Sequence, residues 1–346
     1  IVGEFAVHLA LAEGRKCFYT TPIKALSNQK FADLSKRYGT ESVGLLTGDN
    51  TINGEAPIVV MTTEVLRNML YASSPTLAGL GYVVMDEVHY LADRFRGGVW
   101  EEVIIHLPES VRLVSLSATV SNAEEFADWL VTVRGETKVI VEEHRPVPLW
   151  QHMMVGSRLF DLFSAKGSGV TLNPELSRAT GEEERRHRSG ACHDGQSGRG
   201  RDRRPRRRDM PSRLDVVERL DAEGLLPAIT FIFSRAGCDA AVEQCLRANL
   251  RRNTPAESEQ VLAIVEERTT AIPDEDLPVL GYHAWLEGLR RGIAAHHAGM
   301  LPTFQEVVEE LFTRGLVKAV FATETLAHGI NMPARTGVLE RPVKWN

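Results

Sequence analysis

Short apolar runs alternate with longer amphipathic stretches along most of this chain. The clearest run is Tyr82–Met85, four apolar residues that are followed at once by Asp86 and Glu87 and, two positions later, by His89. A strand buried on both faces forms an unbroken apolar run, and parallel sheets are built from such strands. We therefore predict a buried parallel strand here, with two carboxylates at its carboxyl end.

The order of strand and helix repeats through residues 1–141. Further strands are predicted at Lys16–Thr21, Val43–Leu46, Pro57–Met61, Val111–Leu116 and Thr137–Val141. Helices are predicted at Ile1–Ala12, Ile23–Tyr38, from Thr62 to about Tyr71, at Phe95–His106 and at Ala123–Leu130. This alternation favours an α/β fold with a mostly parallel, doubly wound sheet flanked by helices.

A second alternating unit begins near Leu214. Its predicted strands are Ala228–Phe233, Gly292–His297, Val317–Ala322 and Gly337–Glu340, and its predicted helices are Leu214–Ala222, Arg235–Leu250, Pro255–Thr269 and Phe304–Arg314. A chain of 346 residues exceeds one typical core. We therefore expect two domains of the same architecture, 1–145 and 214–346, joined by a connecting segment, 146–213, in which Leu149–Val155 is one more strand.

The connecting segment differs from the rest in composition and charge. Gly167–Arg213 has almost no aromatic or β-branched residues, and Arg185–Arg213 holds eleven arginines and three aspartates, a local charge of +8. Because the whole chain carries −6, the remaining residues carry −14. Such a tract buries too little apolar surface to offset its ordering entropy, so we expect it to be disordered. It either holds nucleic-acid phosphates non-specifically or is a solvated spacer.

Bulk composition is ordinary for a soluble globular protein, at 43% hydrophobic and 25% charged residues. No apolar run approaches the roughly 18–20 residues of a membrane span, and we expect a cytoplasmic protein without membrane contact. The four cysteines, at positions 17, 192, 238 and 245, form no CxxC pair. We interpret them as small core residues rather than as a metal site.

Polar residues follow the predicted strands in a way that suggests phosphate chemistry. Two adjacent carboxylates, Asp86 and Glu87, are costly at a strand end unless a hydrated Mg²⁺ and its nucleotide phosphates accompany them; otherwise they form an ordinary acidic turn. Thr20–Leu26 and Thr62–Glu64 place hydroxyls at helix starts. These are either anion-binding helix N-termini or plain helix caps.

Together these motifs resemble the superfamily 2 helicases, specifically the DExH-box RNA helicases of the superkiller, exosome-associated type and their actinobacterial HelY-like group. The matching stretches, in chain order, are Thr21–Lys30, Thr47–Asp49, Thr62–Arg67, Asp86–His89, Asp93–Gly97, Ser117–Thr119, Phe231–Arg235, His296–Pro302 and Ala322–Thr336. The set covers nearly the whole chain outside the connecting segment. Ser117–Thr119 alone is unspecific, but the ordered set is highly specific.

The resemblance implies two RecA-like domains that bind ATP and Mg²⁺. Asp86 would hold Mg²⁺ through its water shell, and Glu87 would orient or deprotonate the attacking water. Three further side chains would couple the nucleotide to domain closure: His89, Ser117 and Thr119. Gly329 and Asn331 would belong to the segment that closes over ATP.

The same resemblance implies that the protein holds a single strand of RNA by its sugar-phosphate backbone and moves along it in the 3′-to-5′ direction. The contacts would come from Pro22, Lys24, Thr47, Gly48 and Thr63 in the first domain, and from Ser234, Arg235, Gly299 and Thr323 in the second. RNA-degradation machinery is the implied partner. A monomer is expected, although the residues themselves leave the oligomeric state open.

Three departures from the family pattern qualify this expectation. The family's phosphate loop would precede Ile1 and its arginine-finger segment would follow Asn346, so we expect an internal fragment that is inactive alone. In addition, His328 stands where an apolar residue is expected. The alternatives are a DNA-repair helicase of the same superfamily and a catalytically inactive nucleic-acid-binding fragment. The residues around Asp86–Tyr90 and Arg94–Gly97 favour RNA.

Overall fold

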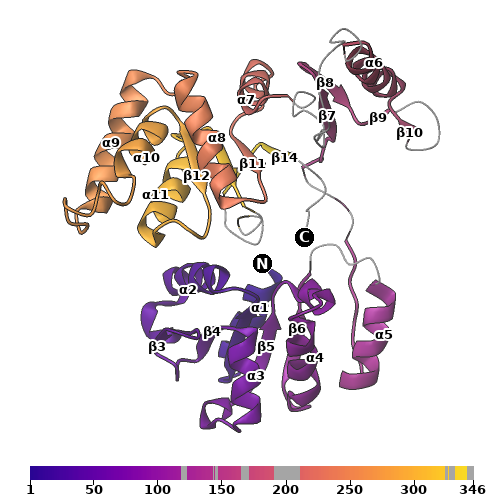
Figure 1. Ribbon diagram of the computed structural model, residues 1–346. Helices are drawn as coiled ribbons and strands as arrows, with labels where there is room; N and C mark the ends of the chain where they lie inside the picture. Colours follow the sequence, from indigo (N-terminus) through magenta and orange to yellow (C-terminus); the bar gives the residue numbers. More distant parts are fainter. Residues whose placement is uncertain are drawn as a thin grey trace, which may run out of the picture. The chain divides into compact units, whose positions relative to one another are not determined.

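The computed structural model describes residues 1–117, 123–142, 144, 147–164, 171–190, 211–323, 326 and 332–340, with the backbone alone at 123–124 and 183–190. The chain divides into two compact units, residues 1–143 and 144–346 (Figure 1). Both are α/β units with parallel strands flanked by helices, as the sequence predicts.

The first unit is built on a sheet with the strand order β3-β2-β4-β1-β5-β6. Its strands are β1 Lys16–Thr21, β2 Val43–Leu46, β3 Thr51–Ile52, β4 Ile58–Thr62, β5 Leu80–Met85 and β6 Arg112–Ser115. All pairings are parallel except that of β3, which runs antiparallel to β2. The predicted strand of four apolar residues is therefore β5, held between β1 and β6.

Helices cover both faces of this sheet, and the period-2 alternation of a strand decides which residues meet them. Tyr19 packs with α1 (Val2–Ala12) and α2 (Lys24–Tyr38), whereas its neighbour Phe18 faces the opposite cluster. That second cluster is formed with α3 (Thr63–Tyr71), α4 (Gly97–His106) and α5 (Ala123–Arg134). Short 3₁₀ turns, η1 Thr40–Ser42, η2 Pro75–Leu77 and η3 Val88–Ala92, complete the unit.

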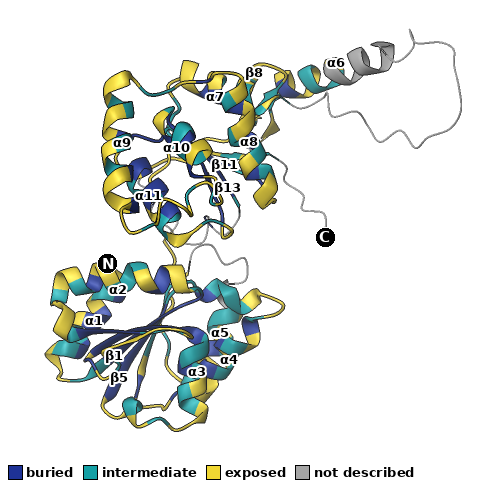
Figure 2. Cartoon of the chain, turned by 60° about the vertical axis from the view of Figure 1, so that its left-hand side comes forward, coloured by how far each residue is buried: buried dark blue, intermediate teal, exposed yellow. Residues whose placement is uncertain are grey.

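The second unit contains a smaller parallel sheet with the order β12-β13-β11-β14. Its strands are β11 Ala228–Phe231, β12 Ile293–His296, β13 Ala319–Ala322 and β14 Thr336–Leu339. One face packs against α7 (Arg213–Ala222) and α8 (Arg235–Arg247), and the other against α9 (Pro255–Thr269), α10 (Tyr282–Arg290) and α11 (Pro302–Thr313). In Figure 2 the central strands of both sheets are buried, as at β5 and β13, whereas the edge strands β3 and β14 are largely exposed.

Part of the connecting segment is ordered, so the expectation of disorder from Gly167 onward is wrong for residues 171–190. Two short hairpins, β7 His152–Val155 with β8 Arg158–Asp161 and β9 Phe163–Ser164 with β10 Thr171–Leu172, precede α6 Pro174–Gly190. The helix begins where Asn173 Oδ1 accepts the Glu175 amide at 3.0 Å, and Leu176 is buried. Good helix formers and a proline in the first turn suffice without aromatic residues. Residues 191–210 lie outside the described part.

The sequence also predicted one strand that is not there and, besides α6, missed helix α10, Tyr282–Arg290. Residues 137–141 form no strand, and Ile140 is 80% exposed. Strand propensity needs a neighbouring strand and a buried face, and 137–141 find neither. The missed helix, α10, depends on distant packing, because Trp285 stacks on Phe304 with ring centroids 4.0 Å apart.

Three of the four cysteines behave as predicted. Cys17, Cys238 and Cys245 are free, fully buried residues of the two cores, and burial raises the pKa of Cys17 and Cys238 to about 12. Cys192 lies outside the described residues. None of the described helices has the length and apolar character needed to cross a membrane.

An ion pair at the start of α9 gives a prediction about pH. Lys318 Nζ lies 2.6 Å from Glu257 Oε1, and this hydrogen bond, with those from Thr254, lowers the pKa of Glu257 to about 2. A carboxyl with a lowered folded-state pKa adds stability above its unfolded pKa and loses it as pH falls. Lys318→Met should therefore cost about 1 kcal/mol at pH 7, after allowance for solvent screening, and progressively less below pH 4.5. Urea unfolding across this pH range measures the difference.

The control for this prediction is Arg247→Met. Arg247 pairs with Glu243 at 2.7 Å on the surface of α8, with both side chains more than 60% exposed. Its removal should change the unfolding free energy by less than about 0.5 kcal/mol at any pH. An equal loss for Lys318→Met at pH 7 and pH 3.5 would show that packing, and not charge, connects Lys318 to stability.

Candidate nucleotide and nucleic-acid site

The carboxyl ends of five strands meet at one edge of the first sheet, because β1, β2, β4, β5 and β6 are parallel. The sheet order fixes the order of the predicted site residues along this edge. From one side to the other they are Thr47 and Gly48 after β2, Thr63 after β4, Pro22 and Lys24 after β1, Asp86 and Glu87 after β5, and Ser117 after β6. The fold thus brings together residues that are up to 95 positions apart, counting from Pro22 to Ser117. Ligands of open α/β sheets bind at such an edge.

Asp86 is held in a fixed orientation by three hydrogen bonds. Its amide donates to the Thr20 carbonyl at 2.9 Å, its Oδ1 accepts the Glu87 amide at 3.1 Å, and its Oδ2 accepts the Tyr19 hydroxyl at 2.7 Å. Burial, and then the charge of Asp86, raise the pKa of Tyr19, so the phenol stays protonated and donates. A single carboxylate is enough to hold a Mg²⁺ ion, because Mg²⁺ takes most of its ligands from water and phosphate.

Glu87 adopts a left-handed backbone conformation, with φ 55° and ψ 46°. This region costs a residue with a Cβ about 1–2 kcal/mol, and such strain concentrates at functional sites. The next amide, that of Val88, donates to the Leu116 carbonyl at 2.8 Å and anchors the turn. Glu87 Oε2 lies 3.1 Å from His89 Nδ1, a close electrostatic contact without a hydrogen bond.

A hollow opens beside the carboxylates, over the starts of α2 and α3. It is lined by Pro22, Ile23, Lys24, Gly48, Thr62, Glu64, Val65, Asn68 and Arg96. Within the described residues no side chain caps either helix start, and Thr63 Oγ1 instead donates to the Thr21 carbonyl at 3.3 Å. The plain-cap interpretation of Thr62 and Thr63 is therefore wrong. Uncapped helix amides that face a hollow are suited to bind anions.

Lys24 and Thr47 meet across this hollow through one carboxylate. Lys24 Nζ lies 2.9 Å from Asp49 Oδ1, and Thr47 Oγ1 donates to the same atom at 3.0 Å. The hydrogen bond from Lys24 lowers the pKa of Asp49. Both partners of the ion pair are more than half exposed, so an incoming phosphate can compete for Lys24 at little cost.

The second sheet gathers its predicted residues at its own carboxyl edge. Ser234 Oγ accepts the Gly237 amide at 3.2 Å and so caps α8, and Arg235 follows it. A Cβ added to Gly299 would lie 3.4 Å from Arg235 Cδ, which makes these two residues neighbours. Thr323 directly follows β13, and its amide donates to the His296 carbonyl at 3.3 Å.

The Gly299 turn is positioned by residues that were not predicted to do so. His297 Nδ1 accepts the Gly299 amide at 3.2 Å, and its Nε2 lies 3.0 Å from Asp239 Oδ1. Because Nδ1 accepts a hydrogen bond, the ring proton is on Nε2, which donates a hydrogen bond to Asp239. A carboxylate on α8 thus orients the turn through the imidazole.

The chain has recognisable relatives among known proteins. The model of the DEAD/DEAH box helicase family matches residues 4–126, which lie in the first unit. Residues 4–126 form a DEAD/DEAH box helicase domain. It is 63% identical over its whole length to "Probable helicase HelY" of Mycobacterium tuberculosis (strain H37Rv), of which it spans 38%. It is also 42% identical over 98% of its length to the chloroplastic DExH-box ATP-dependent RNA helicase DExH15 of Arabidopsis thaliana, covering 31% of that protein. Human exosome RNA helicase MTR4 is 38% identical over the whole chain, which covers 32% of it.

Some of the predicted helicase residues lie outside the described part of the chain. These are Thr119, Gly329 and Asn331, together with His328. Ser117 is described and exposed, directly after the Leu116 carbonyl that accepts the Val88 amide. Tyr19 was missed because its role depends on β1 lying beside β5, which composition does not reveal.

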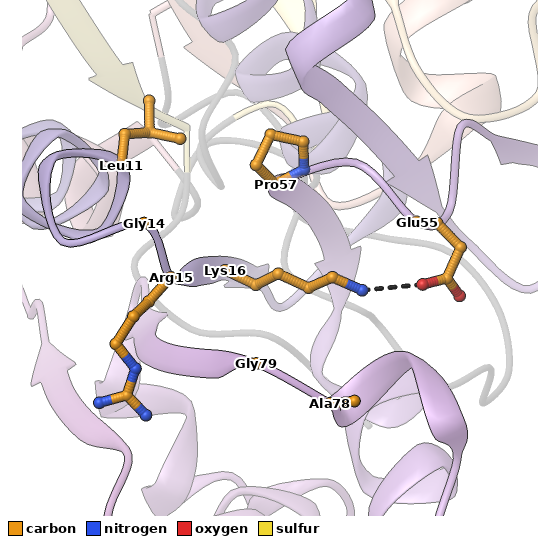
Figure 3. A pocket seen from close by; sticks show the side chains of 8 residues that line it. All are labelled: Leu11, Gly14, Arg15, Lys16, Glu55, Pro57, Ala78 and Gly79. Atoms are coloured by element: carbon orange, nitrogen blue, oxygen red, sulfur yellow. Dashed lines mark hydrogen bonds and ion pairs between the residues drawn. The ribbon is translucent and has the colours of Figure 1, made fainter.

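A second hollow lies at the opposite edge of the first sheet, where β1 and β5 begin (Figure 3). Its two basic side chains, Arg15 and Lys16, are both bonded to neighbouring residues of the same unit. Lys16 Nζ bonds to Glu55 at 2.8 Å and to the Thr76 carbonyl at 3.3 Å, and Arg15 bonds to the Leu80 carbonyl at 2.8 Å. The helicase motifs lie at the other edge, so we assign no function to this hollow.

The backbone strain at Glu87 predicts a separation of stability from function. Glu87→Gly removes a Cβ penalty of about 1–2 kcal/mol at the cost of about 0.5–1 kcal/mol of chain entropy. We expect an unfolding free energy equal to, or up to about 1 kcal/mol above, that of the unsubstituted chain, measured by urea titration. Glu101→Gly, at an exposed position inside α4, should instead lose about 1 kcal/mol. A comparable loss at both positions would contradict the strain.

Proposed function

We propose that this chain is the motor core of an ATP-dependent RNA helicase that translocates 3′ to 5′ along a single strand. One observation carries the proposal: the Asp86–Glu87 pair and the hollow with uncapped helix starts share one edge of one sheet. Since the chain spans only 38% of its HelY relative, the activity of the whole protein is part of the proposal.

On the nucleotide side, each group has a distinct role. Mg²⁺ bound with ATP supplies charge neutralisation at the phosphates, and Asp86 would hold it through a water. Glu87 takes the proton of the attacking water at its carboxylate, and His89, 3.1 Å away, keeps that carboxylate oriented. The Val88–Leu116 backbone hydrogen bond connects this turn to Ser117. With Thr119, Gly329 and Asn331, Ser117 senses whether the nucleotide is bound.

On the nucleic-acid side, the proposed contacts go to the sugar-phosphate backbone. Pro22, Lys24 and Gly48 line the hollow of the first unit. Thr47 precedes Gly48, and Thr63, whose side chain is buried, lies between the lining residues Thr62 and Glu64. Ser234, Arg235, Gly299 and Thr323 supply the equivalent edge of the second unit. Backbone contacts carry no sequence information, which suits a motor that moves along any sequence.

RNA is the proposed substrate because two relatives are named as RNA helicases, DExH15 and the exosome helicase MTR4. The latter name also supports RNA-degradation machinery as the partner. The HelY name specifies no nucleic acid, so a DNA strand is the second candidate.

Substitution of the general base tests the catalytic assignment. Glu87→Gln in the full polypeptide that carries this chain should lower RNA-stimulated ATP hydrolysis by about 10²–10⁴-fold, because the amide cannot take the proton, while ATP binding persists. Phosphate release and nucleotide titration measure the two quantities. Glu101→Gln, at an exposed position of α4, is the matched control and should retain full turnover. Near-normal hydrolysis by the Glu87 variant would remove Glu87 from the mechanism.

Competition between strands tests the substrate. A fluorescent single-stranded RNA bound to the chain should be displaced more readily by unlabelled RNA than by DNA of the same sequence. Affinity should fall steeply with salt, as phosphate contacts require. Fluorescence anisotropy at two salt concentrations measures both effects. Stronger displacement by DNA would favour the repair-helicase alternative.

A further inference from the structure

Arg96 is the side chain that ties the two halves of the first unit's site together. It lies between η3 and α4 and bonds to Glu64 Oε1 through two nitrogens, at 2.5 and 3.2 Å. The same guanidinium donates to the Pro22 carbonyl. It also lies 5.8 Å from the ring centroids of both Tyr90 and Trp100. One residue thus joins the starts of α2 and α3 to the segment that follows Glu87 and His89.

The loop that presents Arg96 is firmly fixed. Asp93 Oδ1 accepts the amides of Phe95 at 2.9 Å and Arg96 at 2.8 Å, and these bonds lower the pKa of Asp93. Gly97 donates to the Asp93 carbonyl at 2.8 Å, and a Cβ on Gly97 would lie 2.1 Å from the Leu91 carbonyl oxygen. The backbone of Arg96 is therefore tied to the end of η3 and moves with it.

We propose that Arg96 is a positioning residue that masks the Glu64 carboxylate in the nucleic-acid hollow and transmits the state of the Glu87 turn to that hollow. The proposal deepens the proposed function and rests on it. Glu64 lines the hollow, and an unmasked carboxylate there repels a phosphate. Arg96 cancels this charge with a forked pair.

The second half of the proposal follows from the aromatic contacts. Tyr90 is the neighbour of His89 in η3 and stacks on the fully buried Trp100 at 5.7 Å. The Arg96 guanidinium lies against both rings, so a movement of η3 displaces Arg96. Displacement of Arg96 releases the Pro22 carbonyl and exposes Glu64 at the same time.

Removing the two charges singly and together separates this role from a direct phosphate contact. Arg96→Met should weaken binding of single-stranded RNA by this chain about tenfold at low salt, because Glu64 is then unmasked. Adding Glu64→Gln to Arg96→Met should restore most of the affinity. Fluorescence anisotropy with a labelled RNA gives both numbers. If Arg96 itself held a phosphate, the double variant would remain weak, and the proposal would be overturned.

Two controls exclude a general effect of charge or of folding. Arg37→Met, alone and with Glu4→Gln, breaks a surface pair of 2.6 Å in the same unit and should change affinity less than twofold. Raising the salt should shrink the Arg96→Met defect, since it arises from repulsion, whereas a folding defect would persist. Arg96→Lys keeps the charge but not the fork, and it should retain intermediate affinity.

The outcomes distinguish this inference from the function on which it rests. If the unsubstituted chain binds no RNA, both fail. If it binds RNA and Arg96→Met binds equally well, only the role of Arg96 fails. In the full polypeptide, Arg96→Met with Glu64→Gln should bind RNA but show reduced RNA stimulation of ATP hydrolysis, because charge is restored without the link to Tyr90. Full stimulation would overturn the transmission half.

Discussion

The parallel pairing of β1 with β4 on one side and β5 on the other is the constraint on which the rest of the first unit depends. Thr20 is aligned with Met61 and with Met85, so the three strands end within a residue of one another. The segment that we propose to bind phosphate and the pair of acidic residues then lie at the same edge, although they are far apart in the sequence. The strands of the second sheet also end together, because Phe231 and His296 are both aligned with Ala322.

This constraint also explains how far the sequence could predict the structure. Strands buried on both faces are mostly apolar, so β1, β4 and β5 were identifiable to within one or two residues. The α/β class and the order of motifs followed from them. The strand predicted at 137–141 was wrong, because its β-branched residues suit a strand but none of the described strands pairs with them. Helix α10 escaped notice because Gly288 lies within it, and its stability comes from Trp285 on a distant Phe304.

For the site, the sequence predicted the ends of strands but not the contacts between them. Asp86, Glu87 and the threonines were recognisable from their positions after apolar runs. Tyr19 was not, and Arg96 entered only as part of the Asp93–Gly97 match, without its role, since their partners Asp86 and Glu64 lie 67 and 32 residues away. Such contacts depend on strand order and register, which are properties of the folded sheet. The positioning of Gly299 by His297 and Asp239 belongs to the same class.

The buried cysteines have a consequence for how the two units can be studied. Cys17 lies in the core of the first unit, and Cys238 and Cys245 lie in that of the second. Burial raises the pKa of each thiol, to about 12 for Cys17 and about 11 for Cys245, so none of them reacts as a thiolate while its core is closed. Alkylation of each thiol therefore requires, and reports, opening of the core that contains it. Alkylation at each position, followed by peptide mapping, reports whether the two units unfold together or one after the other.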